Sequence, residues 1–130
     1  MIRRMFVIDS DLIIDLLRGV PQSQEFFNKI KSREYMAYFS TISETEIFSG
    51  QTASTPNDQN ILEDLFEIMN RIDVDKKIAR KAGELRRKFG CSIPDAIIAA
   101  SAIVNKFTTV ATRNIKHYEK IRDLKVFTPY

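Results

Sequence analysis

Short apolar runs alternate with amphipathic stretches along this 130-residue chain. The runs at residues 5–8 and 35–39 are continuous and apolar, which is typical of strands buried on both faces of a parallel sheet. Residues 107–111 predict another strand, and two very short strands are expected at residues 72–74 and 125–127.

The stretches between these strands carry apolar residues at helical spacing, often behind capping residues such as Ser, Asp or Pro. They predict helices at residues 12–17, 21–30, 40–50, 61–69, 75–89, 92–106 and 115–120. Residues 51–60 (QTASTPNDQN) are polar with a central proline, so they predict a loop. We find no internal repeat and no linker, and expect a single domain over residues 1–130.

The alternation of strands and helices predicts an α/β fold with a central parallel sheet and helices on both faces. Ligands bind such sheets beyond the carboxyl ends of the strands. The residues that directly follow each strand are therefore the first candidates for chemistry.

Composition narrows the possible function classes. The chain is 44% hydrophobic and 28% charged, like an ordinary globular protein, and its net charge of +3 permits a polyanionic partner without requiring one. One cysteine and one histidine exclude a disulfide framework, a cysteine zinc site and a histidine-rich metal site. We expect Cys91 to be a packing residue and His117 to be structural.

Apolar runs in this chain never exceed five residues, whereas a membrane-spanning helix needs about 20. The short N-terminal apolar run is followed at once by Asp9 and Asp11, unlike a signal peptide. The sequence therefore predicts a cytoplasmic protein without a membrane partner.

Acidic or amide side chains follow three of the predicted strands or begin a late helix. They are Asp9, Glu46, Asp95 and Asn114, and a parallel sheet can bring all four to one edge. Clustered carboxylates repel one another unless a cation neutralises them. Mg²⁺ prefers such oxygen ligands, and it can activate water and neutralise charge on a phosphate. This is the chemistry of metal-dependent nucleases, and the pattern is compatible with it.

Each acid also has a purely structural interpretation. Asp9 is suited to be a helix N-cap, and Ser43-x-x-Glu46 is formally a capping box. Ser92-x-x-Asp95 is a similar arrangement, with Pro94 placed near a helix start. From spacing alone, helix capping and metal binding both stay open.

Four segments, taken together, resemble the motifs of PIN domains, and especially of VapC-type toxins. The segments are VIDSDLIIDLLRG at residues 7–19, STISETEIFSG at 40–50, IPDAIIAA at 93–100, and TRN with HY at 112–118. They cover nearly the whole chain in the family's order. One motif alone is weak, whereas four in register are specific.

This resemblance implies a three-layer α/β/α fold with a parallel sheet. It implies Mg²⁺- or Mn²⁺-dependent endoribonuclease activity as the toxin of a toxin–antitoxin pair, with Asp9, Glu46 and Asp95 as metal ligands. It further implies a homodimer, a cognate antitoxin that blocks the site, and a structured RNA such as transfer or ribosomal RNA as substrate. Water activated by the metal and oriented by Asp9 or Asp95 is the expected nucleophile.

This chain departs from the family pattern at two positions. Asn114 stands where many relatives have aspartate, and Asp11 stands where serine or asparagine is common. Asn114 can bind a metal through its carbonyl oxygen but brings no charge. Our hypothesis is that Asp11 acts as a further metal ligand and restores part of the missing charge. The alternative is a solvated acid in the first turn of a helix.

Candidate substrate contacts are less sharply defined. Arg18, Arg86 and Arg113 lie in or near the matched motifs, and RNA requires positive charge beside the acids. Thr112 and Ser10 are suited to hydrogen-bond a carboxylate or a phosphate, or simply the backbone at the strand ends.

Two other functions compete with a ribonuclease. The first is a PIN-like protein that is catalytically weak or inactive at Asn114 and binds RNA or a partner without cleavage. The second is a phosphoacceptor receiver domain, in which Pro94-Asp95 and Thr112-Arg113-Asn114 have no counterpart. The three intact acids favour the ribonuclease.

Overall fold

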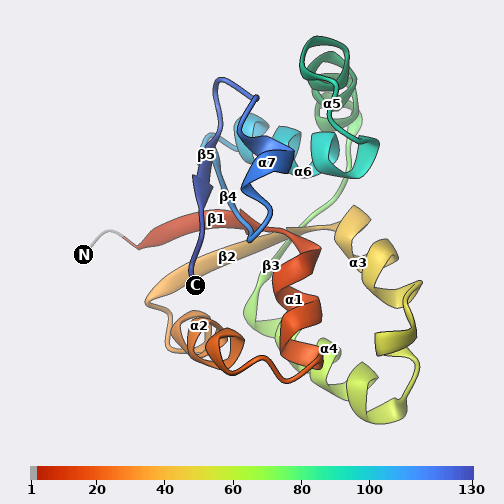
Figure 1. Cartoon of the computed structure of the whole chain (residues 1–130), viewed down its shortest axis with the longest axis vertical. Coiled ribbons are helices and arrows are strands. Elements are labelled where there is room, and N and C mark those ends of the chain that lie inside the picture. Colours follow the sequence, from red (N-terminus) through yellow and green to blue (C-terminus); the bar gives the residue numbers. More distant parts are fainter. Residues whose placement is uncertain (1–2) are drawn as a thin grey trace.

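The computed structural model describes residues 3–130 and contains five parallel strands in one sheet (Figure 1). The strands are β1 (Arg4–Ile8), β2 (Tyr35–Ser40), β3 (Asn70–Ile72), β4 (Thr109–Ala111) and β5 (Lys125–Phe127). Their order across the sheet is β3-β2-β1-β4-β5. The predicted parallel sheet is confirmed, with β1 at its centre.

Helices cover both faces of this sheet. They are α1 (Ser10–Leu17), α2 (Pro21–Lys31), α3 (Thr41–Phe48), the 3₁₀ turn η1 (Gln51–Ala53), α4 (Pro56–Ile68), α5 (Lys76–Phe89), α6 (Ile93–Val104) and α7 (Ile115–Tyr118). One core lies between the sheet and α1, α2 and α4, and a second lies between the sheet and α5, α6 and α7 (Figure 1). This arrangement is the predicted three-layer α/β/α fold.

Alternating residues of the central strand enter the two cores. Phe6 and Ile8 belong to the core beneath α1 and α2, whereas Val7 belongs to the core beneath α5 and α6. All three side chains are completely buried. Burial on both faces explains why this strand is a continuous apolar run rather than an alternating one.

Three sequence predictions need correction. Residues 51–60 are not a loop, because Thr55 caps α4 by accepting a hydrogen bond from the backbone of Asp58 and Pro56 occupies the first turn. The third strand lies at Asn70–Ile72 rather than 72–74, and the fourth begins at Thr109 rather than at Phe107. Thr108 has a positive φ of 53°, a left-handed conformation that no strand continues.

The pairing of β1 with β4 determines where the candidate residues meet. Ile8 lies opposite Ala111, and the backbone N–H of Asp9 donates to the carbonyl of Ala111 at 2.9 Å. Because the two strands are parallel, the residues after them, Asp9 and Thr112, emerge at the same edge of the sheet. Within residues 3–130, no helix combines the length and apolar character needed to cross a bilayer.

Candidate functional site

Asp9 lies at the junction between β1 and α1, and its two carboxylate oxygens have different hydrogen-bond partners. Oδ1 caps α1 by accepting the backbone N–H of Ser10 at 2.8 Å. Oδ2 accepts the hydroxyl of Thr112 at 2.9 Å and that of Tyr118 at 3.0 Å. The side chain is only 5% exposed. Asp9 is therefore both the predicted cap and the centre of a polar cluster.

Tyr118 connects this carboxylate to the next acid along the sheet edge. Its buried hydroxyl lies 3.2 Å from Oδ1 of Asp95 as well as 3.0 Å from Asp9. Asp95 is held in the first turn of α6, where its backbone N–H donates to the capping hydroxyl of Ser92 at 3.3 Å. Nδ1 of His117 approaches the other Asp95 oxygen at 3.3 Å.

Asp11 joins the cluster from the first turn of α1. Its Oδ2 accepts the backbone N–H of Arg113 at 2.9 Å and the Asn114 amide at 3.2 Å, and it lies 3.3 Å from the Thr112 hydroxyl oxygen. Its Oδ1 is buried without a hydrogen-bond partner. The structure therefore places Asp11 directly beside Asn114, the position at which the chain lacks the family's acid.

Glu46 reaches the cluster from α3. Its Oε1 is buried without a hydrogen-bond partner, and the charge of Asp95 acts on Glu46 across the contact between α3 and α6. The cap of α3 is Ser40, which accepts from Ile42, while Ser43 lies buried inside the helix. The capping-box interpretation of Ser43 and Glu46 is thus wrong, and helix capping does not account for Glu46.

Burial and mutual repulsion make these acids reluctant to ionise together. Burial, followed by the charge of Asp11, raises the pKa of Asp9 to about 6 despite the hydrogen bonds from Thr112 and Tyr118. Burial also raises the pKa of Asp11. Burial and then the charge of Asp95 raise the pKa of Glu46, an effect that the nearby Ser10 hydroxyl partly offsets. The cluster therefore favours a cation that would neutralise it.

A divalent metal ion needs several oxygen ligands that converge on one point. In the part of the chain that the structure describes, no three His, Cys, Asp or Glu side chains are arranged to hold a metal ion. Asp9 and Asp95 instead share the Tyr118 hydroxyl. The unpartnered buried oxygens of Asp11 and Glu46 nevertheless fit a hard cation, since Mg²⁺ takes oxygen ligands. Sharing one ion would require side-chain rotation from this arrangement.

Comparison with known families identifies the family of the chain. The family model described as PIN domain matches residues 6–123. The chain belongs to the PIN domain family. A similar curated protein is ribonuclease VapC10 of Mycobacterium tuberculosis, which is 29% identical over 126 residues that cover 93% of this chain and 91% of the relative.

Solved structures with this PIN fold include several toxin–antitoxin complexes. A complex from Klebsiella pneumoniae is 26% identical, with a TM-score of 0.78 over 96% of this chain and 98% of that one. VapBC2 from Rickettsia felis, bound to a promoter DNA fragment, is 22% identical with a TM-score of 0.79 over 95% and 97% of the two chains. DNA-bound VapBC from Salmonella typhimurium is 20% identical with a TM-score of 0.79 over 99% and 100%. Below 25% identity, the last two show the fold alone.

The three arginines of this PIN domain that the sequence singled out lie at different distances from the acids. Arg113 forms an ion pair with buried Asp15 at 2.7 and 2.8 Å, so its guanidinium fixes the segment after β4 to α1. Arg86 donates to the carbonyl of Cys91 at 2.9 Å, near the start of α6. Arg18 caps the far end of α1, about 13 Å along the helix axis from Asp9, and is not brought to the cluster.

Two residues in or beside the acid cluster were not singled out from sequence. Tyr118 lies in the fourth motif, but nothing in its sequence position predicts that its hydroxyl meets two acids. Asp15 had a signal, because it is a lone acid four residues after Asp11 on an apolar helix, and it is 3% exposed. Its second partner is the hydroxyl of Tyr130 at 2.7 Å.

Proposed function

We propose that this PIN domain is an endoribonuclease that depends on Mg²⁺ or Mn²⁺ and acts as the toxin of a toxin–antitoxin pair. The observation that carries the proposal is the convergence of Asp9, Asp11, Glu46 and Asp95 at one sheet edge, with two of their oxygens buried and unpartnered. The similarity to a ribonuclease over most of both chains supports RNA as the substrate.

Asp9, Glu46 and Asp95 are the proposed metal ligands, and Asp11 is proposed as a further one. The ion, when bound, would activate a water molecule and neutralise charge that develops on the phosphate. The carboxylate of Asp9 or Asp95 would orient the attacking water, whose oxygen bonds to phosphorus as the bond to the leaving sugar oxygen breaks.

The remaining residues of the cluster orient these acids. Thr112 and Tyr118 fix Oδ2 of Asp9, and Asn114 fixes Oδ2 of Asp11 while its backbone N–H donates to the Thr112 hydroxyl at 3.0 Å. Ser10 lies against Glu46. In the proposal Thr112 and Ser10 therefore act mainly on carboxylates, and Asn114 contributes an amide rather than a charge.

The decisive experiment compares the purified chain with Asp95→Asn and with Asp123→Asn, a matched change at an exposed acid away from the cluster. Each protein is incubated with total cellular RNA in Mg²⁺, Mn²⁺ or EDTA. We expect cleavage by the wild type and Asp123→Asn, none by Asp95→Asn, and none in EDTA. Metal binding without cleavage of any RNA, including isolated transfer and ribosomal RNA, would favour the alternative of a non-cleaving binding protein. Equal cleavage by Asp95→Asn would contradict a role for the cluster.

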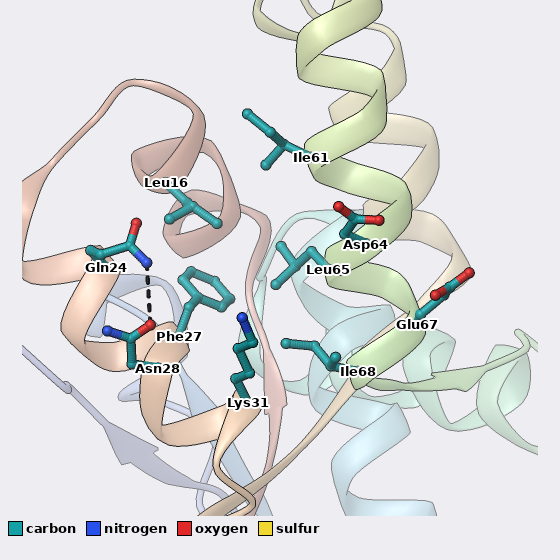
Figure 2. Close-up of a pocket in the computed structure, with 10 residues that line it drawn as sticks. All are labelled: Leu16, Gln24, Phe27, Asn28, Lys31, Ile61, Asp64, Leu65, Glu67 and Ile68. Atoms are coloured by element: carbon teal, nitrogen blue, oxygen red, sulfur yellow. Dashed lines mark hydrogen bonds between the residues drawn. The ribbon is translucent and has the colours of Figure 1, made fainter.

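A second surface, formed by α1, α2 and α4, is a candidate binding site for a partner protein. A groove of about 560 Å³ lies between α1, α2 and α4. Figure 2 shows the side chains that line it. Its apolar residues are Leu16, Phe27, Ile61, Leu65 and Ile68, and its rim is polar. Ile61 and Ile68 are 36% and 40% exposed, although both are large and apolar. We propose that an amphipathic segment of an antitoxin covers this groove.

This partner proposal is tested by co-expression with a candidate antitoxin from the same genome and affinity purification. Ile61→Glu with Ile68→Glu is expected to abolish co-purification while RNA cleavage by the free protein persists. Retained co-purification would move the interface elsewhere. We also propose a homodimer, as expected from the resemblance, and light scattering of the purified chain measures its mass directly.

A further inference from the structure

A cavity adjoins the acid cluster, and Asp95 is one of the residues that line it. It has a volume of about 370 Å³ and lies between the segment that follows α5 and the helix α7. Asp95 and His117 stand at the boundary between the cavity and the cluster, with the imidazole 3.3 Å from the carboxylate. Whatever occupies this cavity therefore lies directly beside the reacting groups.

The two walls of the cavity differ in chemistry. Phe89 and Ile121 form an apolar wall, and both pack into the core beneath α5 and α6. Lys116 and Lys120 supply a cationic wall, and both are exposed. Gly90 turns the chain between these walls with a positive φ of 71°, which keeps the loop close to α6.

The lysines on this wall have no acidic partner. Among residues 3–130, neither Lys116 nor Lys120 takes part in an ion pair. By contrast, Lys81 and Lys88 on the neighbouring helix α5 both pair with Glu84, at 3.5 and 2.9 Å. Two ammonium groups that form no direct ion pair are therefore available to bind an anion at this wall.

This combination matches one unpaired nucleotide of an RNA strand. A volume of 370 Å³ falls within the range of about 300–1,000 Å³ typical of small-ligand sites. An aromatic side chain can stack on a base, and lysines can bind the phosphate. A base enters such a cavity only when it is unpaired, so the strand must be single-stranded or a loop at this point.

We propose that this cavity binds the nucleotide next to the scissile phosphate of a single-stranded RNA segment, with the base against Phe89 and the phosphate between Lys116 and Lys120. The assignment rests on the proposed ribonuclease function, and it specifies the form of RNA that the site accepts. The lysines are substrate-binding residues, whereas the acids carry out the reaction.

Binding is measured without cleavage, by fluorescence anisotropy of a labelled single-stranded RNA oligonucleotide with the full chain in EDTA. The test variant is Lys116→Gln with Lys120→Gln. The matched control is Lys76→Gln with Lys77→Gln, which removes two exposed lysines at the opposite end of α5, about 20 Å from Phe89. Circular dichroism verifies that both double variants are folded.

The test variant is expected to bind at least about tenfold more weakly, and the dependence of log affinity on log salt is expected to flatten by about 1.4, the value for two lost phosphate contacts on a single strand. The control is expected to stay within about twofold of the wild type. Binding by the test variant within about twofold of the wild type, or an equal loss in the control, would overturn the proposal.

A second variant tests the base-binding wall separately. Phe89→Leu keeps an apolar side chain in the core but removes the aromatic face. It is expected to weaken binding of the intact oligonucleotide, and to have no effect on an oligonucleotide of the same charge that lacks its bases. An equal loss with both oligonucleotides would exclude base stacking in the cavity.

The outcomes separate this inference from the proposed function. If the wild type cleaves RNA and the Lys116/Lys120 variant cleaves it with unchanged KM, the nuclease stands and the subsite is wrong. If the wild type does not cleave but the lysine variant loses RNA binding, the cleavage proposal fails, and with it the assignment to a scissile phosphate. The cavity then stands as a nucleotide-binding site of a protein that binds RNA without cleaving it.

Discussion

The hydroxyl of Tyr118 lies 3.0 Å from Oδ2 of Asp9, although 109 positions separate the two residues in the chain. The hydroxyl oxygen of Tyr118 also lies 3.2 Å from Oδ1 of Asp95. Because a phenol carries a single proton, it can donate to only one of these carboxylates at a time. Tyr118 therefore lies where it can position both acids, but it cannot donate to both at once. The repulsion between the carboxylates of Asp9 and Asp95 remains, and a bound metal ion would relieve it.

Tyr118→Phe removes this hydrogen bond and leaves the ring in the core. Loss of an outer-shell partner typically lowers metal affinity by about 10–100-fold, so we expect at least a tenfold loss of Mn²⁺ affinity by isothermal titration calorimetry. Tyr130→Phe is the matched control, since its hydroxyl binds Asp15 instead. Unchanged affinity in Tyr118→Phe, or the same loss in Tyr130→Phe, would contradict the assigned role.

The raised pKa of Asp9 predicts how pH affects the stability of the metal-free protein. An acid whose pKa is about 6 when folded and 3.8 when unfolded holds its proton longer in the folded state. The contribution of Asp9 to the free energy of unfolding is therefore fully present below about pH 4. It is lost as the pH rises through 6, and the loss is about 3 kcal/mol at most.

This pH effect is measured by urea unfolding in EDTA at several values between pH 4 and pH 7, for the wild type and Asp9→Asn. Asparagine cannot ionise, so the wild type is expected to lose free energy of unfolding relative to the variant across this range. Added Mn²⁺ at pH 7 is expected to restore the loss, because it binds the ionised carboxylates of the folded state. Parallel pH curves for the two proteins would refute the prediction.

Asp11→Asn tests whether Asp11 supplies the charge that Asn114 lacks. The two side chains are in contact at 3.2 Å, which makes a functional exchange between them feasible. We expect a several-fold loss of Mn²⁺ affinity in Asp11→Asn and its recovery when Asn114→Asp is added. Unchanged metal affinity and unchanged RNA cleavage in Asp11→Asn would contradict the hypothesis that Asp11 supplies the missing charge.

Arg113→Met is expected to destabilise the fold by about 2–3 kcal/mol. The change leaves the carboxylate of Asp15 buried with only Tyr130 as partner, and removing one member of a buried ion pair is costly. The value lies below the range for fully buried pairs because the guanidinium is 48% exposed. Urea unfolding measures the loss, and adding Asp15→Asn is expected to recover part of it.

Arg18→Met serves as the control for this change. Arg18 is exposed at the C-terminal end of α1 and forms no ion pair among residues 3–130, so its replacement is expected to alter stability by less than about 0.5 kcal/mol. Equal destabilisation by both substitutions would mean that the Asp15 pair has no special contribution.

The fold could be predicted well from the sequence, because the spacing of apolar residues reflects which sides of a helix or strand are buried. The apolar run of β1 and the helical spacing in α5 each reflect which sides of an element face a core. The error at residues 51–60 arose because the first turn of α4 is polar and exposed, so hydrophobic spacing carried no signal there. Only the capping pair Thr55 and Asp58 marked the helix start.

The candidate site was predictable in part for the same reason. Asp9 and Asp95 stand at fixed places, after a strand and in a first helical turn, where sequence patterns are informative. The partners of these acids are set by packing between distant segments, which no spacing encodes. Tyr118 and the pairing of Asp15 with Arg113 therefore emerged only from the structure, and the functional roles of the site residues stay predictions.

The central place of β1 between β2 and β4 has a consequence for the order in which the protein is made. Asp9 is synthesised roughly a hundred residues before its hydroxyl partners Thr112 and Tyr118. A nascent chain thus carries the first acid long before it can arrange a working cluster. In the proposed nuclease the acid cluster would therefore stay unassembled on the ribosome until β4 and α7 have been made.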